Sequence, residues 1–252
     1  MVWALRFHGV GNAAAVELGS AMGTIERDGA PWLTIDCGGE GLTACLAHYG
    51  EPPRALFLTH THFDHIAGFE RLFVATYFDA QRRGRVRLYV PAALVPHLHQ
   101  RVGDYPNVLA EGGANFWDAF QLIPVGRAFW HDGVRLETFP VRHHWPDTAF
   151  GLRLQGSLVW TGDTRPIPEM LAAVANDREL VAHDCALHGN PSHSGIDDLE
   201  REYPPGLLAR CVLYHYASPG DGAALRARGY RVAQPGEAIA LTEPTAPRAE
   251  PL

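Results

Sequence analysis

The stretch from Thr59 to Gly68 reads THTHFDHIAG and holds three histidines and one aspartate within six positions. Imidazole nitrogens and carboxylate oxygens are the groups that bind zinc and similar divalent ions. Two histidines separated by one residue can direct both rings at one ion, while the Asp-His pair that follows faces a neighbouring point. The spacing therefore predicts a site for two metal ions rather than one.

More histidines and aspartates directly follow apolar, strand-like runs elsewhere in the chain. A loop that leaves the end of a strand can present such side chains at the rim of a sheet, so their recurrence favours one shared site. A shared site of this kind would explain why the chain has as many as fourteen histidines. The candidates at strand ends are His60, His62, Asp64, His65, His143, His144, Asp163, His183, Asp184 and His215.

The elements that would position these residues are short strands interspersed with helices. Asp28-Gly29 is a strong hairpin signal, and the buried run at residues 54–58 leads into the histidine cluster. Two mixed sheets packed face to face, with helices outside, fit this order. Strands are expected at residues 2–7, 23–27, 32–36, 54–58, 86–90, 134–141, 149–154, 157–161, 179–183, 211–214 and 238–241. Helices are expected at residues 40–49, 66–78, 92–101 and 166–175, with an irregular stretch to about residue 115 and a polar loop before residue 211.

Length and composition restrict the class of protein. A chain of 252 residues with 46% hydrophobic residues can bury one core, which we assign to residues 1–242, whereas the Pro-rich tail 243–252 is expected to be disordered. Polar residues interrupt the first apolar run, no run is long enough to span a membrane, and four scattered cysteines fit reduced thiols. A soluble cytoplasmic protein is expected. The net charge of −7 disfavours a broad nucleic-acid surface.

The histidine motif resembles the HxHxDH signature of the metallo-β-lactamase superfamily. The later elements PVRHH, WTGDT and LYHYAS occur in the order known from that superfamily. The resemblance extends from GVGNA, which is similar to the glycine-rich opening of the phosphodiesterase-like branches, to AQPGEAIAL near the end. It implies an α+β fold, a four-layer αββα sandwich of two mixed β-sheets, with the histidines on the rim between the sheets.

The resemblance also implies a role for each matching residue. The third histidine ligand is expected at His143, because the family pattern places it after an apolar residue and one spacer, and His144 is the alternative. The ions are expected to be zinc, with manganese or iron as alternatives. The first ion would be bound by His60, His62 and His143, the second by Asp64, His65 and His215, and Asp163 would bridge them.

Two divalent ions lower the pKa of a bridging water to about 7, and the resulting hydroxide can attack phosphodiesters, β-lactams, thioesters or lactones. Zinc β-lactamases commonly have cysteine where this chain has Asp163. Glyoxalase II-like thioesterases add a helical C-terminal domain, but only 37 residues follow His215. Ribonuclease Z typically carries its tRNA-clamping arm between the third histidine and the bridging aspartate, and here only two strands and a turn separate His143 from Asp163.

The remaining resemblance is to the small phosphodiesterases of the ribonuclease Z and PhnP-like branch. The expected substrate is a cyclic nucleotide or a cyclic sugar phosphate. The alternatives are a lactone or thioester hydrolase, a ribonuclease Z-like nuclease without the arm, and a non-catalytic binding module. The expected partner is the small-molecule substrate, and a homodimer is a further expectation.

Two catalytic residues are expected. Asp64 would bind the second ion and orient the attacking hydroxide. His193, in PSHSG, resembles the histidine of the GHS motif of ribonuclease Z and could donate a proton, although a surface loop would also explain it. The run QRRGRVRLYV, with four arginines between Arg82 and Arg87, is consistent with phosphate binding or with the wet face of a strand.

Overall fold

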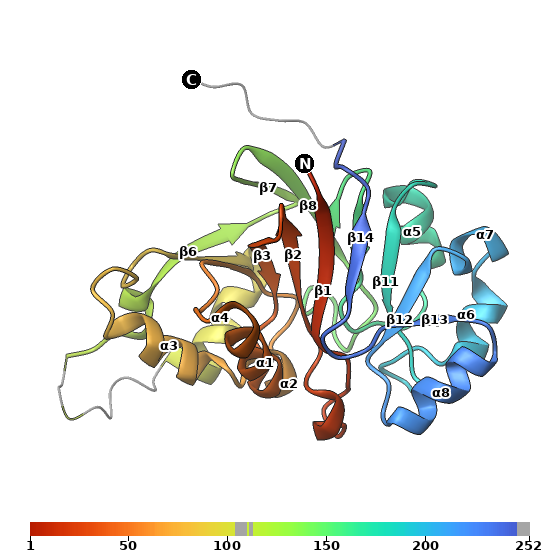
Figure 1. Cartoon of the computed structure of the whole chain (residues 1–252), viewed down its shortest axis with the longest axis horizontal. Helices are drawn as coiled ribbons and strands as arrows, with labels where there is room; N and C mark the ends of the chain where they lie inside the picture. Colours follow the sequence, from red (N-terminus) through yellow and green to blue (C-terminus); the bar gives the residue numbers. More distant parts are fainter. Residues whose placement is uncertain (104–109, 111–112, 246–252) are drawn as a thin grey trace.

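Two mixed sheets of seven strands each lie face to face in the computed structural model, which describes residues 1–103, 110 and 113–245 (Figure 1). The α+β sandwich expected from the sequence is therefore confirmed. In spatial order the first sheet contains β14 (Ala238–Leu241), β1 (Trp3–Gly9), β2 (Met22–Arg27), β3 (Ala30–Ile35), β4 (Ala55–Phe57), β5 (Val86–Pro91) and β6 (Phe120–Val125). The second contains β13 (Arg231–Val232), β12 (Cys211–Tyr214), β11 (Leu180–Asp184), β10 (Leu158–Trp160), β9 (Phe150–Leu154), β8 (Val134–Pro140) and β7 (Ala128–His131).

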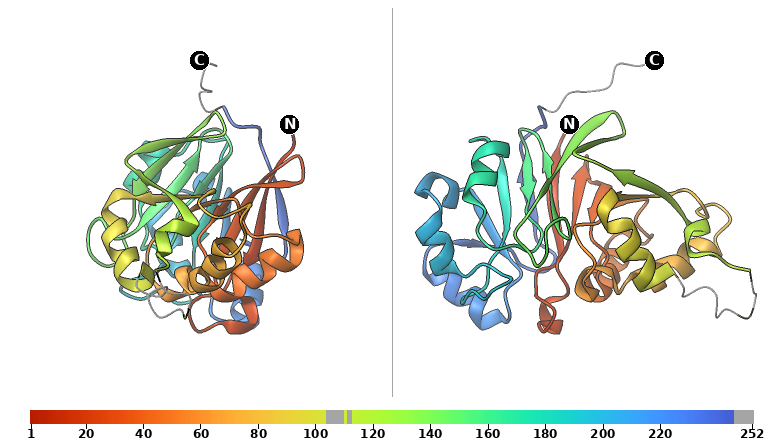
Figure 2. Two further views of the ribbon diagram at one scale, coloured as in Figure 1. Left: turned by 90° about the vertical axis from the view of Figure 1, so that its left-hand side faces the viewer. Right: turned by 180° about the vertical axis from the view of Figure 1, so that it is seen from behind.

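Helices cover the outer face of each sheet, as the views from the side and from behind also show (Figures 1 and 2). The helices beside the first sheet are α1 (Gly39–Tyr49), α2 (Phe63–Ile66), α3 (Phe69–Tyr77) and α4 (Val95–Leu98). Those beside the second are α5 (Pro168–Val174), α6 (Ile196–Glu202), α7 (Pro205–Leu208) and α8 (Pro219–Ala227). The shorter turns are the 3₁₀ helices Val16–Leu18, Ala92–Leu94 and Phe116–Ala119 and the π-helical turn His99–Gly103.

The space between the sheets is filled by large apolar side chains. Phe7 of β1 stacks on Trp160 of β10, with ring centroids 5.6 Å apart, and Trp160 in turn lies 4.5 Å from the ring of Tyr214. Gly23 makes room for this packing, since a Cβ there would stand 2.9 Å from Trp160. Burying one such side chain stabilises a fold by about 1.5–3 kcal/mol. A second core lies between the first sheet and helices α1 and α3.

Strand direction brings the predicted site residues to one rim. Strands β3, β4, β5 and β6 run parallel, as do β10, β11 and β12, so the carboxyl ends of each group lie at a common edge. The loops after β4 and β8 are joined across the two sheets by an isolated bridge between His60 and Ala149, where the Phe150 amide donates to the Thr59 carbonyl (2.9 Å). This rim between the sheets holds the site described below.

Several sequence-based boundaries were wrong. The helix expected at residues 66–78 begins three residues later, as α3, and a separate short helix, α2, precedes it; at Gly68, between the two, a Cβ would lie 2.8 Å from the Cys37 carbonyl oxygen. The helix expected at 92–101 is three short turns of different type. The supposed polar loop before residue 211 contains α6 and α7; α6 buries only Ile196 and Leu199, too few apolar residues to reveal a helical period.

Other elements had no sequence prediction at all. Strands β7 and β13 have only four and two residues, β6 contains a proline, and helix α8 buries only Gly222 and Leu225, so their apolar pattern is weak. The stretch expected to be irregular up to about residue 115 lies largely outside the described residues. Of the tail from residue 243, only 243–245 are described, and the Thr245 amide donates to Gln155.

The four cysteines are buried and free, as expected for reduced thiols. Within residues 1–103, 110 and 113–245, we find no helix long and apolar enough to cross a membrane.

Candidate metal centre

The loop that leaves β4 brings its first two histidines close to a third from another strand end. His60 Nε2 lies 3.1 Å from His62 Nδ1, and His143 Nε2 lies 3.2 Å from the same His62 nitrogen. His143 follows β8 in the second sheet, so this contact depends on the two sheets facing each other. The ligand atoms of His60, His62, His143 and Asp163 all lie within 4.8 Å of one another.

A second group of side chains shares Asp163 with the first. The Oδ2 atom of Asp163, after β10, lies 3.3 Å from His65 Nε2 and 3.3 Å from His215 Nε2. Asp64 Oδ2 lies 3.5 Å from each of the same two imidazoles. The structure thus brings together all seven residues that the sequence proposed as ligands, in two groups with Asp163 in common.

Unpaired polar atoms at the centre of these groups test whether they suit metal ions. His65 Nε2, His215 Nε2 and Asp163 Oδ1 are buried and make no hydrogen bond. Leaving such atoms unpaired is unfavourable, and most buried polar groups in native proteins have a partner. Nitrogen and carboxylate oxygen donors that converge without other partners fit divalent cations. The residues present therefore fit two ions.

The two ligand groups differ in the pKa values of their histidines. Burial lowers the pKa of His143 to about 4 and that of His60 well below its usual value, so both rings are neutral and able to offer a lone pair. Burial also opposes protonation of His215, but Asp163 and Asp184 raise its pKa to about 10. Burial would raise the pKa of Asp163, yet His215, His65 and His60 hold it well below its usual range. Without metal, protons on imidazoles therefore balance the carboxylates of the second group.

Asp36 is a supporting residue that the sequence analysis missed. Its Oδ2 accepts from His65 Nδ1 (2.8 Å), and its Oδ1 accepts from the Thr59 amide (2.8 Å). The first contact fixes the tautomer of His65 so that Nε2 faces the site, as outer carboxylates commonly do for metal-binding histidines. Asp36 follows β3 directly, but the sequence analysis counted it as the last residue of a strand. Had the expected strand ended one residue earlier, at Ile35, the search for residues that follow strands would have found it.

Asp184 holds His193 beside the same cluster. Its Oδ2 lies 2.9 Å from His193 Nδ1 and also accepts from the Thr164 amide (2.9 Å), while its Oδ1 lies 3.4 Å from His215 Nδ1. Burial lowers the pKa of His193, but the hydrogen bond and the charge of Asp184 outweigh this and raise it. Neighbouring His183 instead bonds to the Tyr203 hydroxyl (2.7 Å), away from the ligand groups.

His144 lies beside the ligand groups but belongs to neither. Its backbone has a φ of 57°, and its ring contacts those of His143 and His62 at centroid distances of 4.2 and 4.8 Å. The adjacent Trp145 is 80% exposed. Of the two histidines that the sequence left open, His143 is the one whose ring nitrogen reaches the cluster.

Two cavities open onto the cluster. The larger, about 650 Å³, is lined by Asn12, Phe63, Asp64 and His193 among others. The smaller, about 230 Å³, is lined by His97, His144 and Trp145 on the other side of His62. Cavities of a few hundred Å³ suit small molecules. Between His143 and Asp163 the chain forms only β9, a turn at Gly156 and β10, so no arm is inserted there.

Comparisons with known proteins agree with this geometry. A solved structure described as a new diphosphatase from the PhnP family has a TM-score of 0.73 at 18% identity, over 95% of this chain and 97% of that one. A ribonuclease Z from Mycobacterium sp. (strain KMS) is 26% identical over 238 residues, 81% of this chain and 82% of the relative. The fold and site define a metal-dependent hydrolase of the metallo-β-lactamase superfamily, in the branch of ribonuclease Z and PhnP-like proteins.

A more specific match identifies the family. Residues 3–239 match the protein family described as "Anti-Pycsar protein Apyc1". A protein of that name from Saccharibacillus brassicae is 31% identical over 224 residues, which cover 84% of this chain and 89% of the relative. The chain therefore belongs to the Apyc1 family of anti-Pycsar proteins.

Proposed function

We propose that the chain is a phosphodiesterase that hydrolyses a small cyclic phosphodiester, either a cyclic nucleotide or a cyclic sugar phosphate. The observation that carries the proposal is the pairing of His193 with Asp184 beside the seven-residue cluster, because such a pair would supply a proton donor next to the two proposed cations. The similarity to a ribonuclease Z, an enzyme named for cleaving RNA, supports phosphoryl rather than acyl chemistry.

Seven residues would bind the metal ions in this proposal. Asp163 would touch both ions, since its carboxylate is common to the two groups. Zinc is the proposed metal because the donor set is rich in imidazole, and manganese and iron are the alternatives. Two divalent ions, when bound, lower the pKa of a water to about 7 and polarise the bond under attack. The first ion would be bound by His60, His62 and His143, and the second by Asp64, His65 and His215.

His193 is the proposed general acid. Because Nδ1 bonds to Asp184 (2.9 Å), Nε2 is the ring nitrogen left to face a substrate in the larger cavity. The raised pKa of His193 keeps this imidazole protonated over a wider pH range than a free histidine. It can therefore donate the Nε2 proton to the departing ester oxygen, a role typical of histidine.

Asp64 is proposed to orient the attacking water in addition to binding the second ion. One carboxylate oxygen, Oδ2, lies between His65 and His215 at 3.5 Å from each. The other oxygen remains to accept a hydrogen bond from the water. Asp64 also lines the larger cavity, as this role requires.

A small substrate is proposed because of the size of the site. The cavities of about 650 and 230 Å³ can take the two sides of a cyclic phosphodiester whose phosphate lies at the cluster. Processing of tRNA is disfavoured because the chain has no arm between His143 and Asp163 and carries a net charge of −7.

A hydrolysis screen tests the proposal. The purified chain would be loaded with zinc, manganese or iron in turn and assayed on cyclic nucleotides, cyclic sugar phosphates, linear RNA, lactones and thioesters. We expect the fastest turnover on a cyclic phosphodiester. Much faster turnover of a lactone or thioester would replace this function with acyl hydrolysis, and two bound ions without turnover of any substrate would indicate a binding module.

A further inference from the structure

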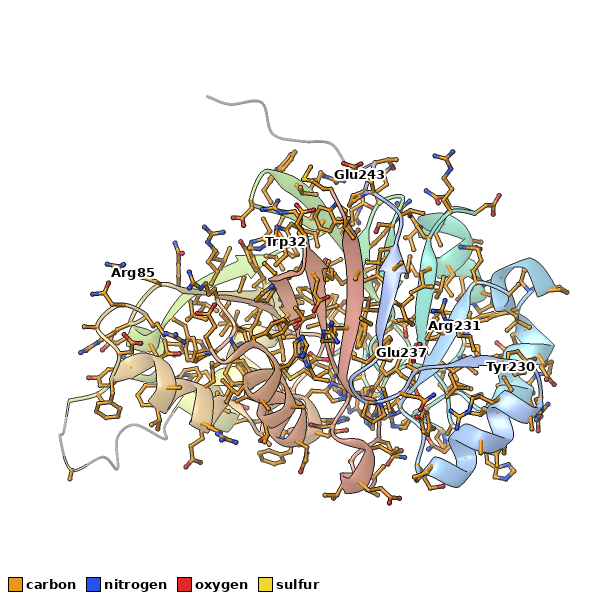
Figure 3. All side chains as sticks on the ribbon, in the orientation of Figure 1. Trp32, Arg85, Tyr230, Arg231, Glu237 and Glu243 are labelled. Atoms are coloured by element: carbon orange, nitrogen blue, oxygen red, sulfur yellow. The ribbon has the colours of Figure 1, made fainter. Side chains whose placement is uncertain are left out.

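A second concave region lies at the opposite end of the first sheet. The parallel strands β3, β4 and β5 start here, whereas their carboxyl ends point toward the metal centre. A cavity of about 770 Å³ opens at these amino ends, and we call it the arginine groove. Figure 3 labels Trp32 and Arg85 along this edge. The groove is lined by Arg27, Ala30, Pro31, Trp32, Arg54, Ala55, Asp79, Gln81, Arg82, Arg85, Val86, Arg87, His131 and Asp132.

The groove explains the arginine-rich run that the sequence left open. Arg85 is exposed, Val86 is buried, Arg87 is partly buried and Leu88 is buried, so the run alternates as one wet face of a strand does. The wet side chains also line a cavity, together with arginines from two other segments. The two interpretations of the run are therefore compatible.

Carboxylates compensate only part of the positive charge. Arg87 pairs with Asp132 (2.6 Å) and Arg82 with Asp79 (3.0 Å). Glu51, behind the groove, is shared by Arg54 (3.0 Å) and Arg82 (3.4 Å). Five guanidiniums thus face three carboxylates, which leaves an excess of two positive charges on a chain whose net charge is −7.

Two arginines carry this excess. Within the described part of the chain, neither Arg27 nor Arg85 forms an ion pair. Arg27 instead lies over the rings of Trp3 and Trp32, at 5.9 Å from each centroid. Trp32 is only 6% exposed and is fixed by His131, whose Nε2 bonds to the Trp32 carbonyl (2.8 Å). Arg27 and Trp32 thus form a packed wall of the groove, and the exposed Arg85 lines it from the β5 side.

The geometry points to a second ligand site: we propose that the arginine groove binds a small anion with two phosphate groups. Guanidinium groups match phosphate oxygens in a bidentate way, and a concave surface concentrates their positive potential. Three strand spacings separate β2, which carries Arg27, from β5, which Arg85 precedes. At about 4.8 Å per spacing, this is roughly 14 Å, so two long side chains can each contact one phosphate of the same molecule.

The test is calorimetric titration of the metal-loaded chain with fructose 1,6-bisphosphate at constant ionic strength, with glucose 6-phosphate as the single-phosphate comparison. We expect one bisphosphate site. Arg85→Glu and Arg27→Gln should each weaken binding by roughly tenfold or more, because each removes a charge-assisted contact. Hydrolysis at the metal centre should not change in either variant.

Arg83 offers a matched control in the same loop as Arg85. It lies over the ring of Tyr77 at 4.0 Å and does not line the groove. Arg83→Glu changes the net charge as Arg85→Glu does, and should leave bisphosphate affinity unchanged. Asp64→Asn should lose hydrolysis and keep the affinity, which separates this site from the metal centre.

Four outcomes would overturn the proposal. The first is that Arg83→Glu and Arg85→Glu weaken bisphosphate binding equally, and the second is that Asp64→Asn abolishes bisphosphate binding. The third is that glucose 6-phosphate binds as tightly as the bisphosphate, and the fourth is that the bisphosphate does not bind even at millimolar concentration.

Discussion

The two ends of the first sheet differ in how their charged groups are solvated. At the rim where β3 and β4 end, His65 and the Asp163 that faces it from the second sheet are each 1% exposed, and several polar atoms have no hydrogen-bond partner. At the opposite end of the sheet, Arg87 of β5 and Asp132, which follows β7, are each 41% exposed and pair with one another. A charge in contact with water interacts weakly with its neighbours, whereas a buried charge interacts strongly. Substitutions at the two ends should therefore differ greatly in effect.

The largest effect is expected for Asp163→Ala, because this carboxylate is common to both ligand groups. Hydrolysis should fall by more than about 10³-fold, since loss of the ions removes several kcal/mol of transition-state stabilisation. Metal content by elemental analysis and turnover should be measured on the same preparation, with His62→Ala as a second variant. Full metal content in both variants would show that the ions bind elsewhere.

His193→Ala should lower turnover by about 10² to 10⁴-fold and leave the metal content unchanged, because His193 acts on the proton and not on the ions. His188→Ala is a suitable control, since His188 is exposed in the same loop and lines neither cavity. Unchanged turnover in His193→Ala would remove its catalytic role. Loss of metal in the same variant would assign it as a ligand.

Asp36→Asn should weaken metal binding by about 10 to 100-fold, which is typical for carboxylates that orient a metal-binding histidine. The asparagine keeps the size of the side chain but offers only one acceptor oxygen for Thr59 and His65. Titration with a metal indicator would measure the change, and excess metal should restore activity. No recovery of activity at saturating metal would contradict a positioning role.

Asp184→Asn should shift the pH dependence of hydrolysis. In the native chain burial opposes protonation of His193, but Asp184 raises its pKa, so a proton donor remains available as the pH rises. Without the negative charge the pKa falls, and the alkaline decline in turnover should begin at a lower pH, with a loss of roughly tenfold at neutral pH. An alkaline limb at the same pH in both proteins would contradict this assignment.

The smallest effect is expected for Asp132→Asn in the arginine groove. The ion pair with Arg87 is exposed, and such pairs contribute about 0–1 kcal/mol to stability. Chemical denaturation should detect a decrease in the free energy of unfolding within that range, and turnover should stay the same. If the free energy of unfolding fell by several kcal/mol instead, the charges in the arginine groove would interact as strongly as buried charges do, despite their exposure.

Much of the fold and the site could be predicted from the sequence. The hairpin at Asp28-Gly29, the strand before the histidine loop and the order of the later strand ends are local signals, and the structure has all of them. The sequence failed where local signals were weak, as in α6, or where a glycine contact interrupts a helical pattern, as at Gly68. Apolar periodicity records burial along one element and not the contacts between elements.

Residue type and strand-end position are properties of short segments, so the residues that could do chemistry were recognisable without a structure. How these residues combine depends on contacts between distant segments. The choice between His143 and His144, the support of His65 by Asp36 and the pairing of Asp184 with His193 each depend on loops far apart in the chain. The arginine groove likewise joins segments from β2 to the turn that follows β7. Such contacts are fixed by the packing of two sheets across a shared core, which no local pattern encodes.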